Sequence, residues 1–326
     1  MKTAFVTGAT GFLGGHLCHL LVTQGWQITA LCRSIPKNPI AGVNYVTGNL
    51  LDASSISDAL ENKTDVLFHV AADTNTWHKN NSQQTSTNIQ GTKNIIEAAV
   101  AKQVGTLLYV SSIVTFGVDH HGLVNTEESN TQTGIDSWVN YVKTKSQAEL
   151  LVKSAPSQLR TVITNPTHII GPADQQNWIR LFKMIINDAL PTIPQGAGSF
   201  ADVRDVANGL ILAAEKGKHN ENYILGGNNL NFPDFIQHVC HVFGCKITAK
   251  VLPHGLVKMV AYLKSRFAPA GGKAPDITPE SLQVISHEYA VSSNKAKTEL
   301  GYTIKPLEQS LEDIKADLIE RKILTP

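Results

Sequence analysis

Tyr141 and Lys145, a tyrosine and a lysine four positions apart, are the pair of side chains in this sequence best suited to proton transfer. The surrounding residues 138–152 have the apolar spacing of a helix, so both side chains lie on one helix face within a single turn. An ammonium group beside a phenol favours the phenolate and lowers the phenol pKa. The spacing therefore predicts an acid that exchanges a proton near neutral pH.

A hydroxyl group is expected close to this pair. Residues 106–110 have the pattern of a buried strand, and the strand runs directly into Ser111 and Ser112. In a doubly wound sheet, the carboxyl ends of the strands border the crevice that binds ligands. Serine after a strand is also common turn chemistry, so both serines stay open as candidates on position alone.

A glycine-rich turn at the start of the chain is the second feature with chemical meaning. An apolar run over residues 4–6 stops at a glycine, and two more glycines follow before a helical pattern over residues 12–23. Glycine lets backbone approach a ligand closely, and the free N–H groups at a helix start attract phosphate. We therefore expect a dinucleotide pyrophosphate here. The expected contacts are Gly8, Thr10, Gly11, Phe12, Leu13 and Gly14.

The end of the second predicted strand, residues 27–32, indicates which dinucleotide is bound. An acidic side chain at this point receives the ribose hydroxyls of NAD, but the first acidic residue of the chain is Asp52. The strand runs instead into Arg33 and Ser34, with Lys37 close behind, and a guanidinium suits a 2′-phosphate. NADP is therefore the predicted cofactor, against the alternative that Arg33 is solvated surface.

Two further strand ends supply candidate cofactor contacts. Asn49 and Leu50 follow the third predicted strand and could hold the edge and the face of the adenine, although neighbouring residues could equally cap a helix. Residues 65–70 have the pattern of a buried strand that ends at Ala71 and Ala72. Small side chains at this place suit a ligand crevice.

The order of the elements that must position these residues gives the fold class. Strand and helix patterns alternate along the chain, which predicts an α/β fold with a Rossmann-type doubly wound parallel sheet. The 326 residues suffice for one large domain or two closely joined ones. We expect a dinucleotide-binding domain over residues 1–166 plus about 201–225. A smaller, discontinuous C-terminal substrate domain would take about 167–200 and 226–326.

Composition argues against several classes of partner. The net charge of +1 gives no electrostatic footprint for nucleic acid. No apolar stretch reaches the ~18 residues of a membrane span, and residues 256–267, which include lysine and arginine, have the pattern of an amphipathic helix, so no membrane partner is expected. The four cysteines lack Cys-x-x-Cys spacing and no leader is visible, which favours a cytoplasmic protein. The histidines form no ligand motif, so no metal is expected.

Together these motifs resemble those of the extended short-chain dehydrogenases/reductases, over essentially the whole length of the chain. The dihydroflavonol-reductase-like and sugar-epimerase-like branches are the most similar. The segments that carry the resemblance are residues 7–14, 69–72, 88–92, the Tyr141 and Lys145 pair, 165–172 and 202–207.

The resemblance implies hydride transfer between nicotinamide C4 and a carbonyl carbon. It implies that Ser112 holds the substrate oxygen, with Ser111 as the competing serine. Tyr141 would transfer the proton, and Lys145 would bind the nicotinamide ribose while tuning Tyr141. It also implies that Asn88 lies near the cofactor.

The resemblance further implies that Pro166 and His168 border the nicotinamide. Members of the family often dimerise through two helices of each nucleotide domain, which here would be residues 88–102 and 138–153. A homodimer is therefore expected. The periodicity does not prove it, because the same apolar faces could pack on the sheet.

The predicted function is an NADPH-dependent reductase of a ketone or aldehyde in a small organic substrate, favoured by Arg33 and by the shortage of basic residues in the substrate domain that could bind a sugar nucleotide's diphosphate. A nucleotide-sugar epimerase is the alternative, and a non-catalytic NADP-binding sensor is the second alternative. A sugar dehydratase is disfavoured because residues 111–116 lack the acidic pair of such enzymes. Candidate substrate contacts, each of which packing could also explain, are Thr74, Trp77, Trp138 and Trp178.

Overall fold

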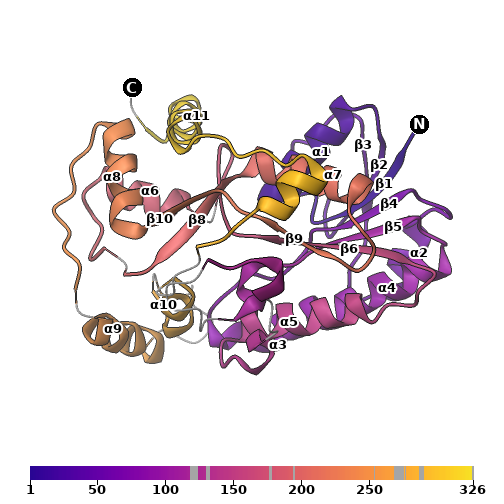
Figure 1. Ribbon diagram of the computed structural model, residues 1–326, viewed down its shortest axis with the longest axis horizontal. Helices are drawn as coiled ribbons and strands as arrows, with labels where there is room; N and C mark the ends of the chain where they lie inside the picture. Colours follow the sequence, from indigo (N-terminus) through magenta and orange to yellow (C-terminus); the bar gives the residue numbers. More distant parts are fainter. Residues whose placement is uncertain are drawn as a thin grey trace.

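A seven-stranded sheet forms the centre of the computed structural model (Figure 1). All its strands are parallel and follow the order β3-β2-β1-β4-β5-β6-β9. The strands are β1 (Thr3–Thr7), β2 (Gln27–Cys32), β3 (Val43–Thr47), β4 (Val66–His69), β5 (Thr106–Val110), β6 (Arg160–Pro166) and β9 (Asn222–Leu225). The predicted α/β class with a doubly wound parallel sheet is confirmed, and the order reverses between β1 and β4, where such sheets bind ligands.

The structure describes most but not all of the chain. The described residues are 1–117, 124–129, 133–175, 178–193, 195–252, 254–267, 275, 277–285 and 290–324. The segment 268–273, whose proline and glycines predict a flexible break, lies outside them, as do His120 and His121.

Helices cover both faces of the large sheet (Figure 1). Helices α1 (Phe12–Thr23) and α7 (Val203–Lys216) pack on one face, and α2 (Ala53–Ala59), α4 (Gly91–Ala101) and α5 (Asn140–Lys153) on the other. Successive side chains of a strand point to opposite faces. In β5, Leu108 and Val110 pack in the apolar core under α1 and α7, while Leu107 and Tyr109 pack in the core under α2, α4 and α5. A short helix α3 (Asn81–Thr85) and a π-helical turn (Ser86–Gln90) lead into α4.

A second, three-stranded sheet lies beyond the carboxyl end of β6. It has the order β10-β8-β7, with β8 parallel to β7 and antiparallel to β10. Its strands are β7 (His168–Ile170), β8 (Ala197–Asp202) and β10 (Asn228–Asn231). Helices α6 (Ile179–Ile186), α8 (Phe232–Phe243) and α11 (Leu307–Glu320) pack around it over an apolar core. No sequence pattern predicts this sheet, because its strands are short and it is assembled from distant segments.

Two more helices lie at the lower left of Figure 1, α9 (His254–Arg266) and α10 (Pro279–Ile285). Helix α9 takes up the stretch whose pattern predicts an amphipathic helix. Residues 247–251, whose pattern predicts a short strand, form only one isolated bridge, between Val251 and Ile193. Within the described part of the chain, no helix has the length and apolarity needed to cross a bilayer.

Candidate active site

The glycine turn between β1 and α1 has the geometry of a phosphate-binding turn. Gly8 has φ +77°, and a Cβ there would lie 2.7 Å from the Ala71 nitrogen. A Cβ on Gly14 would lie 2.1 Å from the Gly8 carbonyl oxygen, so α1 approaches the turn as closely as only glycine permits. Gly11 precedes α1, and no side chain caps the first N–H groups of the helix. Those groups are therefore available to an anion, as the pyrophosphate of a dinucleotide requires.

A cavity of about 1990 Å³ extends from this turn to the second sheet. At the end near β2 it is lined by Arg33, Lys37, Asn49 and Leu50, of which Arg33 and Lys37 are exposed on the rim. The other predicted cofactor residues that line it are Gly8, Thr10, Gly11, Phe12, Leu13, Gly14, Ala71, Ala72, Tyr141, Lys145, Pro166 and His168. The structure thus brings together residues that are up to 160 positions apart in the sequence.

Ser34 and Asn88 do not line the cavity. Ser34 is exposed beside Arg33. Asn88 is buried, and its amide nitrogen donates to the Asp73 carbonyl oxygen at 3.0 Å and to Thr144 Oγ1 at 3.1 Å. Its amide oxygen accepts from the Asp73 N–H at 2.8 Å. Asn88 therefore fixes the loop after β4 to helix α5 from behind the cavity wall.

Tyr141 and Ser112 meet at the middle of the cavity. Both side chains line the cavity. Burial raises the pKa of Tyr141, and the nearby Ser112 side chain opposes that rise. The sequence argument expected the lysine to lower this pKa, but in this structure removal of the phenol from water is the larger effect. A neutral phenol between a serine hydroxyl and an open cavity can donate its proton to a ligand oxygen.

Lys145 is buried one turn after Tyr141 and is directed at the end of β5. Its Nζ donates to Tyr109 Oη and to the Val110 carbonyl oxygen, both at 2.8 Å. Burial lowers the pKa of Lys145 to about 7, while the charge of Glu149 raises it. Near neutral pH, Lys145 therefore has both a protonated and a neutral form, and the ratio of the two depends on a second residue, which no sequence motif indicated.

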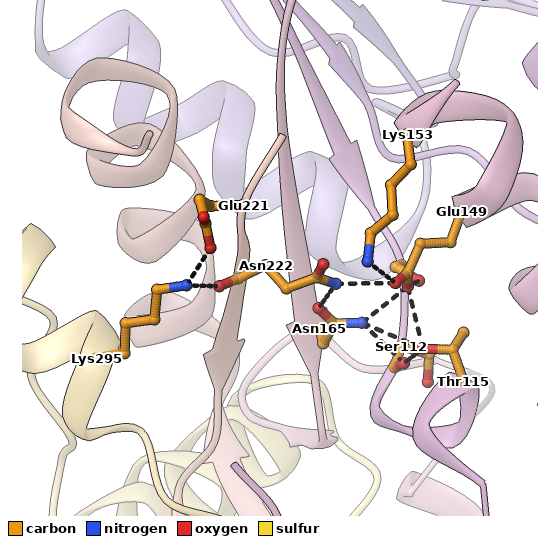
Figure 2. Close-up of polar contacts among 9 residues, drawn as sticks. Ser112, Thr115, Glu149, Lys153, Asn165, Glu221, Asn222 and Lys295 are labelled. Atoms are coloured by element: carbon orange, nitrogen blue, oxygen red, sulfur yellow. Dashed lines mark hydrogen bonds and ion pairs between the residues drawn. The ribbon is translucent and has the colours of Figure 1, made fainter. Parts of the chain in front are cut away.

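Glu149 is that second residue and the centre of a buried polar cluster (Figure 2). Its side chain is only 2% exposed. Glu149 Oε2 accepts from Ser111 Oγ at 2.5 Å, from Thr115 Oγ1 at 3.0 Å and from Asn165 Nδ2 at 3.1 Å. Asn222 Nδ2 donates to Glu149 Oε1 at 2.9 Å. These contacts join α5 to the residues after β5 and to strands β6 and β9.

The same cluster distinguishes the two serines. Ser111 is buried and its hydroxyl is taken up by Glu149, whereas Ser112 is partly exposed to the cavity and contacts Tyr141. The Asn165 amide nitrogen also donates to the Ser112 carbonyl oxygen at 3.2 Å, which fixes the backbone at this position. Lys153 Nζ lies 3.5 Å from Glu149 Oε1. Both serines line the cavity, but only the Ser111 hydroxyl is engaged by Glu149, which favours Ser112 as the serine that meets a ligand.

Aromatic side chains form the wall near the second sheet. The rings of His168 and Trp178 meet edge to face, with centroids 5.1 Å apart, and Phe232 lies beside both. His168 Nε2 is buried and lacks a hydrogen-bond partner among the described residues, and burial lowers the pKa of this histidine to about 4. Thr74 also lines the cavity. The wall thus combines a neutral imidazole with large apolar surfaces.

The other two tryptophans that the sequence analysis named lie elsewhere. Trp77 is buried outside the cavity lining, where Lys79 Nζ lies 4.9 Å from its ring centroid. Trp138 is 57% exposed just before α5 and does not line the cavity. Phe232 lines the cavity and was not anticipated, because its helical spacing in α8 gives no sign of which side faces a ligand. Among the described residues, no group of three or more histidine, cysteine or acidic side chains could hold a metal ion.

Comparisons with known proteins agree with this geometry. Residues 4–226 match the model of the NAD dependent epimerase/dehydratase family. A protein from Synechocystis sp. named "Putative dihydroflavonol 4-reductase" is 28% identical, with 95% of this chain and 92% of that protein covered. A 4-hydroxy-2-methyl-3-oxo-4-farnesyl-3,4-dihydroquinoline-1-oxide ketoreductase from Stigmatella aurantiaca is also 28% identical, over 93% of this chain and 92% of that protein. The crystal structure of a nucleoside-diphosphate-sugar epimerase from Pseudomonas aeruginosa has the same fold, with a TM-score of 0.79 and 20% identity over 98% of each chain.

Proposed function

This chain belongs to the NAD dependent epimerase/dehydratase family, within the extended short-chain dehydrogenases/reductases, and we propose that it is an NADPH-dependent reductase of apolar ketones or aldehydes. The observation that carries the proposal is the apolar character of the cavity on the far side of Tyr141. The apolar side chains that line that part are Leu181, Met184, Leu190, Ile193, Phe232, Leu252, Val257, Leu282 and Ile285. An apolar carbonyl compound gains free energy by leaving water for such a surface, whereas a sugar would lose its hydration.

The chain's own residues can perform the proton side of a carbonyl reduction. Bound NADPH supplies the hydride. Ser112 donates a hydrogen bond to the carbonyl oxygen, which polarises the carbonyl group, and Tyr141 donates a proton to the same oxygen as negative charge develops on it. Lys145 would orient the ribose next to the nicotinamide from its position at the end of β5. Glu149 holds this end of β5 in place.

The rim of the cavity near β2 supports the proposed choice of NADPH over NADH. Arg33 and Lys37 line it, and β2 ends without an acidic side chain. Two cations at this place favour a 2′-phosphate, while an NAD ribose would find no carboxylate to receive its hydroxyls. Gly8 and Gly14 leave room for the pyrophosphate in between. The two named reductases among the relatives support reduction as the reaction.

A nucleotide-sugar epimerase is the second candidate, because two cations, Arg180 and Lys264, also line the substrate part of the cavity. A sugar nucleotide diphosphate could use them. Apolar side chains outnumber them there, which is why reduction is the stronger candidate. A non-catalytic NADP-binding sensor would leave the contact between Ser112 and Tyr141 without a role.

Three further proposals carry over from the sequence analysis. The nucleotide domain would comprise residues 1–166 and about 201–225, the protein would act in the cytoplasm, and two copies would pair through α4 and α5. Light scattering of the purified protein tests the pairing directly, with the mass of a monomer as the contradicting result.

A substrate panel tests the function. Purified protein is incubated with NADPH or NADH and with ketones and aldehydes whose alkyl chains increase in length, and oxidation of the cofactor is followed at its absorbance maximum. We expect turnover with NADPH. Its kcat/KM for the carbonyl substrate should rise about tenfold for every two methylene groups that are added to the substrate's alkyl chain and buried in the cavity. The Tyr141→Phe variant is the matched inactive control. Turnover of a UDP-sugar with a tightly retained cofactor would replace the proposal by the epimerase, and cofactor binding without any turnover would replace it by the sensor.

A further inference from the structure

Helix α9 carries a row of exposed apolar side chains on the side that faces away from the molecule. Leu256, Met259, Val260 and Leu263 of α9 are all exposed, and so is Phe267, which follows the helix and whose N–H still donates to the Leu263 carbonyl oxygen; the exposed fractions run from 39% for Val260 to 78% for Phe267. A helix turns by about 100° per residue, so side chains with the spacing i, i+3, i+4, i+7 and i+11 share one face. We call this set the α9 stripe.

The opposite face of α9 holds the helix to the protein. Ala261 and Ser265 are buried, and both lie on the far side of the helix from the α9 stripe. Ser265 Oγ lies 3.5 Å from His78 Nδ1, and His78 in turn lies 3.3 Å from a carboxylate oxygen of Glu280 in α10. The α9 stripe is therefore not the side by which the helix packs on its own chain.

The charged residues of α9 and of the chain on either side of it are all of one sign. Residues 235–275 contain lysines and arginine but no aspartate or glutamate, although the whole chain has a net charge of only +1. Lys264 and Arg266 lie on the two sides of the α9 stripe, about 80° from Leu256 in each direction, and both are exposed, as is Lys258 on the opposite side of the helix. Within the described residues, none of these three cations forms an ion pair. Cations on both sides of an apolar face are the pattern of a helix that lies in a membrane interface.

Helix α9 also borders the cavity. Val257 and Lys264 line the cavity, together with Leu252 just before the helix. The helix lies at one edge of the molecule, beside α10 (Figure 1). If the α9 stripe contacted a bilayer, an apolar compound dissolved in that bilayer would therefore lie close to the cavity.

We propose that α9 docks on the surface of an anionic phospholipid bilayer, with the α9 stripe inserted among the acyl chains and its flanking cations facing lipid phosphates. This contact lies on the bilayer and does not cross it. It differs from the sequence-based expectation of no membrane partner, which rested on the absence of a spanning segment. The inference that substrate enters from the lipid rests on the proposed reduction of apolar carbonyls, while the docking itself does not.

The charge pattern favours lipid over a second copy of this chain. A second copy would present the same excess of lysine and arginine around its own α9 stripe, and like charges brought together across an interface repel. An anionic bilayer offers the opposite charge over its whole surface. The proposal therefore commits to lipid, and self-association through α9 is a result that would overturn it.

Sedimentation with vesicles tests the docking without any turnover. The protein is mixed with vesicles of phosphatidylcholine alone, or with three parts phosphatidylcholine to one part phosphatidylglycerol, at low and at high salt. We expect binding to the anionic vesicles that weakens at high salt, and at least tenfold weaker binding to neutral ones. The double variant Met259→Glu, Leu263→Glu should lose the binding at least tenfold. Val124→Glu, at an exposed apolar side chain outside α9, is the matched control and should bind as the wild type does.

Two more measurements keep the results separable. The NADPH affinity and melting temperature of the double variant should match those of the wild type, which shows that the variant is folded. The Lys264→Glu, Arg266→Glu variant, which reverses the charges on both sides of the α9 stripe, should bind anionic vesicles at the level of neutral ones. Equal sedimentation of the Met259→Glu, Leu263→Glu variant and the wild type would overturn the proposal, as would a dimer that this variant dissociates. If no carbonyl compound is reduced but vesicle binding persists, the proposed function fails and the docking stands.

Discussion

Replacement of Glu149 by glutamine isolates the effect of one buried negative charge on Lys145. Burial lowers the pKa of Lys145 to about 7, and the Glu149 carboxylate opposes this. Glutamine has nearly the same shape but no charge, so it removes the opposition. The pKa of Lys145 should therefore fall further, and an NADPH affinity that depends on the ammonium form should be lost at a lower pH.

The size of the effect follows from the geometry of the helix. Side chains one helical turn apart lie about 6 Å from each other, which gives about 2.8 kcal/mol between unit charges at an effective dielectric constant of about 20. Four side chains donate hydrogen bonds to Glu149, and Lys153 lies 3.5 Å from it, so its charge is shared. We expect about half of the full interaction, which corresponds to about one pH unit.

The assay is the dissociation constant of NADPH from about pH 5 to 9, measured by cofactor fluorescence. In the wild type we expect the affinity to weaken as pH rises through about 7, where Lys145 loses its proton. In Glu149→Gln the same weakening should occur about one pH unit lower. Glu221→Gln, which removes a half-exposed charge paired with Lys295 at the outer end of the cluster in Figure 2, should leave the curve unchanged.

A second variant separates charge from structure. Ser111→Ala removes one hydrogen bond to Glu149 but keeps the carboxylate, so its affinity curve should keep the wild-type midpoint. The reasoning is refuted if Glu149→Gln binds NADPH with an unchanged or higher midpoint while its melting curve shows a folded protein. A shift of equal size in Ser111→Ala would also refute it, because a loosened β5 end and not the charge would then be responsible.

Tyr141→Phe should lower kcat by about a hundredfold or more, since the proton donor is lost, with the NADPH dissociation constant within about threefold of the wild type; substantial residual turnover contradicts the assignment. Arg33→Ala should reduce the preference for NADPH over NADH by about tenfold to a hundredfold in kcat/KM, because a charge-assisted hydrogen bond to the 2′-phosphate is lost. Gly14→Ala should weaken NADPH binding at least tenfold in a titration, since its Cβ would lie 2.1 Å from the Gly8 carbonyl oxygen. Burial lowers the pKa of His69 from 6.5 to about 3, so the neutral imidazole's contribution to stability is lost as pH falls below 6.5. Urea denaturation should show that the free energy of unfolding is about 2 kcal/mol lower at pH 5 than at pH 7, and an equal free energy of unfolding at the two pH values would contradict this.

Local features of the chain were readable without the structure. The helix over Phe12–Thr23 and the strands over Gln27–Cys32 and Thr106–Val110 have the bounds that their patterns predict. Periodicity and glycine positions report on the backbone of the same few residues, which is why they suffice for single elements. The short strands of the second sheet could not be predicted in this way, since each is stabilised by pairing with a distant segment.

The sequence by itself determined the parallel α/β fold, the glycine turn and the pairing of Tyr141 with Lys145 on one helix, because each depends on backbone geometry and spacing within a short stretch. The tertiary structure alone decided how the two serines differ, since Ser111 bonds a glutamate 38 residues away. It also decided that Trp178 lines the cavity while Trp138 does not, and that the apolar side of α9 faces outward. A pattern shows that a residue is apolar or polar, but which neighbour it contacts depends on how distant segments pack together.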